Sequence, residues 1–145
     1  MALDPYAIHV ALANQIRDYV DADVNVYPWP HRTPDLPAVS IWPGAEYLAY
    51  IGTFGPNGVA DMMLEIVVQQ SAADDESEFK FLSDLLAVGT DAGSSIMDAV
   101  HSDRSLGGLV EDAVVLTALW NADPTQPITA RLPVQIILKK SGALV

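Results

Sequence analysis

The chain has 145 residues, a length that suits one domain able to fold without a disulfide or metal staple. Half of its residues are hydrophobic and the formal charge is -12, from 19 acidic and 7 basic residues, which excludes a disordered chain and a basic nucleic-acid-binding surface. Cysteine is absent, which excludes thiol catalysis and zinc–thiolate sites, and no apolar run reaches the roughly 20 residues of a membrane span.

The N-terminal segment predicts an amphipathic helix. Asp4 is a typical N-cap, and Pro5 suits the first helical position, where its missing N–H costs nothing. Apolar residues then recur at helical spacing at Ile8, Leu12 and Ile16. His9 lies beside this stripe without a partner at metal-ligand spacing, so we expect plain packing or a surface position for it.

A short strand around Val24 and Val26 is expected next, followed by a proline-rich connector. Four prolines fall between residues 28 and 37, and proline removes the donors that a central strand needs. The favoured interpretation is a loop held over the core by Trp29. The alternative is a recognition surface made of prolines and aromatic residues.

Residues 38–70 predict a long hairpin. A short strand, AVSIW, is closed by Pro43-Gly44, the segment 45–51 is extended, and a glycine-rich tip ends at Asn57-Gly58, a strong hairpin signal. Aromatic residues on an exposed tip and arm suggest contact with another chain, against the alternative of packing on their own domain. The candidate partner-binding residues are Tyr47, Tyr50, Phe54 and Asn57.

The strand from Val59 to Gln70 has one apolar and one polar face, because Met62, Leu64 and Ile66 alternate with charged or polar residues. Acidic residues then open a helical stretch that runs to Ser102, with a break between Gly89 and Gly93. We expect this stretch to cover the apolar face of the strand.

Two strands are expected in the last third. Val110 to Trp120 alternates Val114, Leu116, Ala118 and Trp120 against Glu111, Ala113, Val115 and Thr117. In Ile128 to Lys139 the proline at 133 falls on the polar side, which argues for a sheet edge or a bulge. We expect this strand to be an edge that pairs with another copy, with Arg131, Gln135 and Lys139 as subunit-interface candidates.

The predicted fold class is therefore α+β: one domain over residues 1–145, with a mainly antiparallel sheet of about five strands, two main helices on one face and a long protruding β-hairpin. The sequence carries no phosphate-binding loop, no metal motif and no nucleophile elbow. His101, Ser102 and Asp103 lie within one turn and cannot form a catalytic line, and Glu65 and Glu111 are better explained as solvated residues. We expect no catalytic residue, no metal and no cofactor.

The order of elements resembles the tail terminator, or tail-completion, proteins of long-tailed bacteriophages. The likeness covers nearly the whole chain, and its strongest parts are EIVVQQSAADDESEFKFLSDLL and ITARLPVQIILKK. The resemblance implies a structural virion protein, assembled in the host cytoplasm, that caps the tail tube as a homo-oligomeric ring, commonly a hexamer. Its implied partners are other copies, the tail tube protein and the head–tail connector or stopper, and DNA would pass the acidic lumen without specific binding.

Two alternatives remain open at this stage. One is another protein of the head–tail neck, a stopper or an adaptor. The other is a small cytoplasmic α+β enzyme or ligand-binding domain, which the shortage of catalytic parts disfavours. In all three interpretations we expect a protein that is neither membrane-bound nor exported by a signal peptide, because the start, MALDPYAIHV, has an acid where a signal peptide carries positive charge.

Overall fold

The computed structural model describes residues 4–20, 23–31, 34–35, 37–50, 59–69, 75–86, 95–121 and 129–138. Within these residues, six strands form one sheet in the order β1-β2-β3-β6-β4, and β5 also pairs with β6. The elements are α1 (Pro5–Arg17), β1 (Asn25–Tyr27), β2 (Ala38–Tyr50), β3 (Val59–Gln69), α2 (Asp75–Leu86), α3 (Ile96–Ser102), β4 (Asp112–Val115), β5 (Leu119–Asn121) and β6 (Thr129–Ile137).

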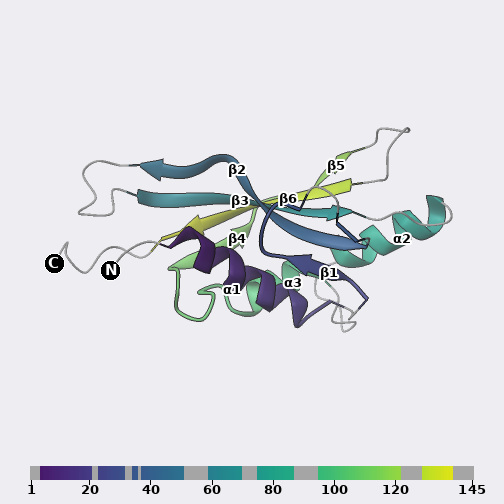
Figure 1. The fold of residues 1–145 in the computed structure, drawn as a ribbon, viewed down its shortest axis with the longest axis horizontal. Helices are drawn as coiled ribbons and strands as arrows, with labels where there is room; N and C mark the ends of the chain where they lie inside the picture. The colour runs from purple at the N-terminus through teal and green to yellow at the C-terminus, as the bar shows by residue number, and fades with distance from the viewer. Residues whose placement is uncertain are drawn as a thin grey trace.

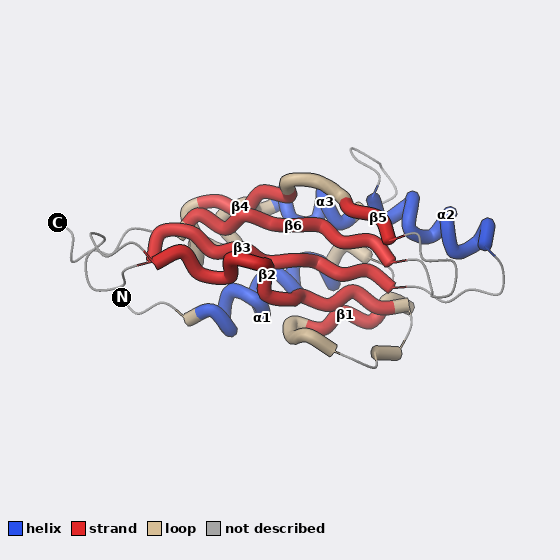
Figure 2. The backbone as a smooth tube through the Cα atoms, turned by 90° about the horizontal axis from the view of Figure 1, so that it is seen from above, coloured by secondary structure: helices blue, strands red, loops and turns tan. Residues whose placement is uncertain are grey.

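The sheet and helices form two layers, which confirms the predicted α+β class. The pairing of β1 with β2 is parallel, and the other four pairings among the described strands are antiparallel. Helices α1 and α3 lie under one face of the sheet, with α2 at one end (Figure 1). Seen from above, none of the described helices lies over the strands on the opposite face (Figure 2).

Helix α1 begins as the sequence predicts. The carboxylate of Asp4 accepts a hydrogen bond from the Ala7 amide at 3.3 Å, and Pro5 occupies the first helical position. At the other end, the Arg17 guanidinium donates to the Val26 carbonyl oxygen at 2.8 Å. This bond ties the end of α1 to β1.

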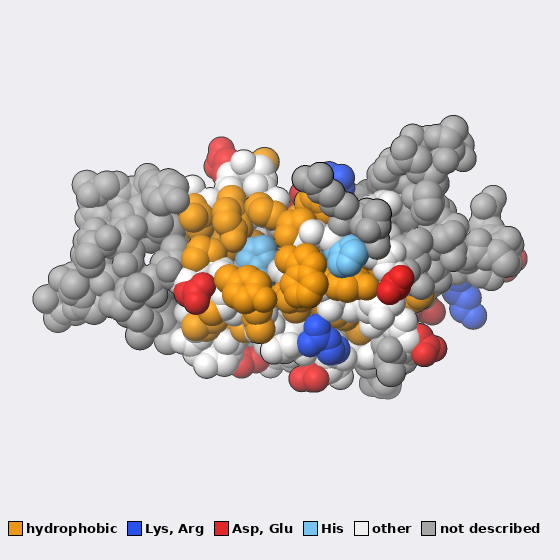
Figure 3. Space-filling model, in the orientation of Figure 1, with side chains coloured by type: hydrophobic (Ala, Val, Ile, Leu, Met, Phe, Trp, Pro, Cys, Tyr) orange, Lys and Arg blue, Asp and Glu red, His pale blue; other side chains and the backbone are white. Residues whose placement is uncertain are grey.

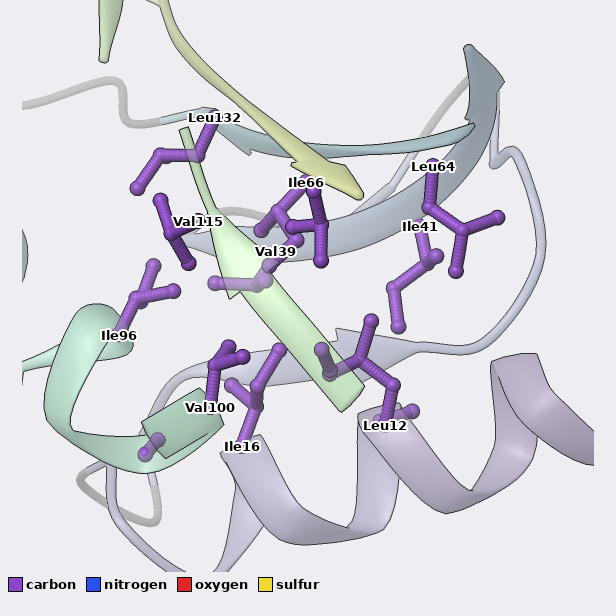
Figure 4. Packing of buried hydrophobic residues seen from close by; sticks show 14 of the residues in the cluster. Leu12, Ile16, Val39, Ile41, Leu64, Ile66, Ile96, Val100, Val115 and Leu132 are labelled. Atoms are coloured by element: carbon purple, nitrogen blue, oxygen red, sulfur yellow. The ribbon is translucent and has the colours of Figure 1, made fainter. Parts of the chain in front are cut away.

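The core confirms the two-residue period of β3. Inward positions Met62, Leu64, Ile66 and Val68 have no exposed surface. The cover comes from α1 and α3, whose residues Leu12, Ile16, Ile96 and Val100 lie against the strands (Figure 4). Helix α2 packs on α3 and adds Leu85 to the core. The predicted cover by residues 74–102 is thus correct for α3, and α1 lies on the same face, as predicted for the two main helices.

Strand β2 continues beyond the stop predicted at Pro43-Gly44. Its register with β3 passes from Pro43 opposite Leu64 to Leu48 opposite Met62, so residues 44–47 form a wide bulge beside Met63. A Cβ atom added to Gly44 would lie 2.9 Å from the Met63 carbonyl oxygen. The glycine therefore permits the two backbones to approach closely instead of ending the strand.

The prediction that the terminal strand is a sheet edge is wrong. β6 lies inside the sheet, with β3 on one side and β4 and β5 on the other. The Pro133 carbonyl accepts from the Leu116 amide at 2.9 Å, so the missing N–H of the proline points to that same neighbour. The outer strand is interrupted there, ending at Val115 and resuming at Leu119. The register of β6 with β3 runs through Pro133 without a bulge, so the irregularity lies in the outer strand opposite the proline and not in β6 itself.

The same interruption corrects the single strand predicted over residues 110–120. It is two short strands, and the buried side chains of β4 are Ala113 and Val115, while Leu116 is 51% exposed. Sequence alternation alone placed Val114 and Leu116 on one face but left its direction unspecified. That face is the outward one.

Candidate functional site

The described residues assemble no cluster of metal-binding side chains. Among them, no group of three His, Asp or Glu side chains is placed to hold a metal ion. The helices within these ranges include none long and apolar enough to cross a membrane. The features that stand out are two surfaces and a buried hydrogen-bonded histidine.

His9 is buried, 5% exposed, and both ring nitrogens have partners. Nδ1 lies 2.8 Å from the Pro28 carbonyl oxygen, which only accepts, so Nδ1 carries the proton. In the neutral ring Nε2 then accepts from the Tyr47 hydroxyl at 2.9 Å. Burial lowers the pKa of His9, which favours this neutral form. The expected packing role is confirmed, and His9 joins α1, the connector and β2.

Of the residues predicted on the hairpin, Tyr47 is the one whose side chain is described. It is half-buried in the bulge of β2, and its ring meets that of His9 edge to face at 5.8 Å between centroids. Burial raises the pKa of its hydroxyl, which therefore stays protonated and able to donate to His9. Tyr47 is thus fixed to its own domain.

For the other three hairpin candidates, the side chains lie outside the part of the chain that the structure describes. The backbone of Tyr50 ends β2 opposite Val59, but its side chain lies outside the described residues, as do Phe54 and Asn57 as a whole. The arms of the hairpin lie side by side and reach past the described start of α1 (Figure 1). The tip prediction for these residues stays a prediction.

His101 also sits at a sheet border. Leu116 directs its N–H toward β6, so Val115, one residue earlier, directs its own away from it. The Val115 amide faces His101 Nε2 at 3.4 Å. His101 therefore covers part of the free edge of β4, which is a structural role.

The face of the sheet opposite the helices, here called the outer face, carries two of the three predicted interface residues. Arg131 lies 3.3 Å from Glu65, and their side chains are 58% and 21% exposed. Gln135 lies on the same face, between Met63 of β3 and Val114 of β4. Lys139 lies outside the described residues.

Cross-strand pairing arranges the outer face in rows, shown as neighbouring strands in Figure 2. One row runs across four strand segments as Leu116, Pro133, Glu65 and Trp42. The next row runs as Leu119, Arg131, Val67 and Ser40. The Glu65–Arg131 ion pair therefore lies at the middle of a largely apolar face.

The apolar side chains of this face include several that are exposed. Leu116 and Leu119 are each 51% exposed, and Ile137 is 37% exposed. Sequence reasoning missed this surface because it assigned β6 to an edge and assumed that its polar side carried the interface. The available signal was Leu116, an apolar residue out of phase with Ala113 and Val115.

A second surface is formed by Tyr27 of β1 together with Trp29 and His31 of the connector that follows it. The Tyr27 ring contacts those of Trp29 and His31 at tilted angles of 59° and 50°, with centroid distances of 5.9 and 4.4 Å. Trp29 is 47% exposed, so the favoured interpretation that it pins the connector over the core is wrong. Figure 3 shows hydrophobic side chains gathered around histidine on this face, with acidic side chains at the border. The recognition-surface alternative stays open.

Comparison with known protein families and with curated proteins gives no match to this chain.

Proposed function

We propose that this chain is a structural protein that caps the tail tube of a long-tailed phage as a ring and joins it to the head connector. The observation that carries the proposal is the placement of apolar side chains on a sheet face that none of the described helices covers, beside a hairpin that reaches past the helix layer (Figure 2). Exposed apolar surface of this kind is typical of proteins that assemble with others.

The net charge of the chain also supports an assembling role. The acidic excess of the whole chain, -12, suits a passage that DNA crosses without adhering, because like charges repel.

Purified full-length protein mixed with tubes assembled from a tail tube protein tests the proposal by electron microscopy. We expect rings at one tube end, and capped tubes that no longer elongate when more tube protein is added. Tubes that stay uncapped and continue to grow would overturn it. Binding to an isolated head connector but not to tubes would instead identify a stopper or adaptor.

The hairpin tip can be tested in the same assay. Phe54→Ala should weaken tube attachment while leaving the melting temperature nearly unchanged. Phe79→Ala is the matched control, because Phe79 on α2 is a phenylalanine with 57% exposure. A large loss of stability in Phe54→Ala would show that Phe54 belongs to the core of its own domain.

A further inference from the structure

The outer face combines exposed apolar side chains with two ion-paired carboxylates and one further acid, Asp61 of β3, which lies beside Ile137 and forms no ion pair among the described residues. Glu65 is paired with Arg131 at 3.3 Å, and Asp112 at the border of the face accepts from Nε and Nη2 of Arg104, at 2.7 and 2.8 Å. The chain as a whole carries -12. The outer face is therefore a place where a second strongly acidic molecule can approach with little repulsion.

The order of charges on this face is self-complementary. Glu65 lies on β3 and Arg131 on the neighbouring β6, side by side on the same face. A two-fold axis that runs parallel to the sheet, in the gap between two copies and midway between these residues, brings the glutamate of one copy over the arginine of the other. A partner of one dominant charge would leave one member of the pair facing a like charge.

We propose that the outer face binds the same face of a second copy of this chain, as a two-fold pair of packed sheets. Two sheets packed face to face lie about 10 Å apart, a gap that interdigitating side chains such as Leu116, Pro133 and Ile137 fill. Arg131, 58% exposed beside Glu65, keeps surface free for a second carboxylate from the other copy. The contact buries Leu116, which follows β4, and Leu119 of β5.

This proposal is independent of the tail assignment. An isologous contact closes after two copies, whereas a ring needs two different surfaces on each subunit. A pair in solution therefore neither requires nor excludes a ring on a tube. The measurement below uses the free protein alone, so its failure leaves the capping assay unaffected.

Charge reversal tests the pair by sedimentation velocity over a range of concentrations. The wild-type chain should associate to dimers. Glu65→Arg and Arg131→Glu should each weaken self-association about tenfold or more, because each places like charges face to face across the axis. An equimolar mixture of the two variants should dimerise again, since one face is then basic and the other acidic.

Two control variants carry the same changes of charge away from the outer face. Glu76→Arg and Lys80→Glu alter exposed residues of α2 and should associate like the wild type. A strictly monomeric wild type would overturn the proposal. Single variants Glu65→Arg and Arg131→Glu that associate like the controls would also overturn it, because the association would then lie elsewhere. A mixture of the two variants that fails to form dimers would overturn it as well.

An apolar variant supplies a second measurement. Leu116→Ser changes a side chain that is 51% exposed, so the fold and melting temperature should be kept while dimerisation falls. Leu109→Ser, at a residue 42% exposed in the loop after α3, is its control. Equal association of both variants would contradict a contact through the outer face.

Discussion

The Nε2 atom of His9 lies 2.9 Å from the hydroxyl oxygen of Tyr47, and this contact ties α1 to the bulge of β2. The ring is held from the other side by the Pro28 carbonyl, 2.8 Å from Nδ1. Three segments far apart in the chain thus meet on one imidazole. Because the ring is buried, removal of either partner leaves a polar atom that water cannot readily satisfy.

Tyr47→Phe should lower the free energy of unfolding by about 1–3 kcal/mol, because His9 Nε2 loses its donor while remaining buried. Urea unfolding followed by circular dichroism measures this change. Tyr19→Phe, which removes the hydroxyl of a tyrosine 36% exposed, is the control and should change little. Unchanged stability in Tyr47→Phe would return Tyr47 to the hairpin-arm role predicted from sequence.

The buried imidazole also gives stability a defined pH dependence. Burial lowers the pKa of His9 below its ordinary 6.5, and the backbone hydrogen bonds to Pro28 and Ile41 offset part of that shift. The unfolded chain therefore takes up a proton at a higher pH than the folded chain does. Stability from this site is complete above about pH 6.5 and declines as the pH falls through that value toward the folded pKa.

Urea unfolding of the wild type and of His9→Gln, from about pH 8 down to about pH 5, checks this sign. The glutamine amide can donate to Pro28 and accept from Tyr47 but does not titrate. The wild type should therefore lose stability on acidification faster than the variant. Parallel pH curves would show that His9 does not carry the effect, since all other titratable groups are common to both proteins.

The parts of the fold predicted correctly from sequence are those fixed by local chemistry. The cap at Asp4 and the two-residue period of β3 depend on neighbouring residues alone. The position of β6 was missed because Pro133 lacks a donor in any setting, and only the partner strand decides whether that gap lies at an edge or opposite an interruption. The outer face depends on the same long-range pairing.

The candidate surfaces show the same division. Sequence placed Arg131 and Gln135 on one face of one strand, which the alternation of a strand guarantees. It could not indicate that Leu116 joins them, because Leu116 reaches that face through pairing with a residue far along the chain. Trp29 was assigned to the core on residue type, whereas its exposure follows from the path of the connector.

Gln15→Glu should destabilise the junction of α1 with α3. The Gln15 amide nitrogen lies 2.8 Å from the Ala99 carbonyl oxygen and 2.9 Å from that of Val100, and so caps the carboxyl end of α3. A carboxylate would meet the same oxygens and the negative end of the helix dipole, at a cost of roughly 1–3 kcal/mol near neutral pH.

Denaturant unfolding measures the effect of Gln15→Glu, and Asn14→Asp is its matched control. That neighbour is exposed and accepts from Arg17, so the same change of charge there should be neutral or slightly stabilising. Acidification that protonates the introduced carboxylate should restore part of the stability lost in Gln15→Glu. Equal stability of both variants would mean that the amide does not cap α3.

Gly44→Ala should destabilise the hairpin by forcing β2 away from β3. The new methyl would lie 2.9 Å from both the carbonyl oxygen and the Cβ atom of Met63, and backbone cannot yield as the end of a side chain does. Overpacking of this kind costs about 1–3 kcal/mol. Ala45→Ser, at the exposed neighbour, is the control and should be nearly neutral.

Amide hydrogen exchange gives the local readout of Gly44→Ala. Protection at Leu64 and Met62 should fall more than protection in β4, because the strain enters between β2 and β3. Uniform loss across the sheet would instead indicate global destabilisation, and no loss would show that the bulge absorbs the methyl group.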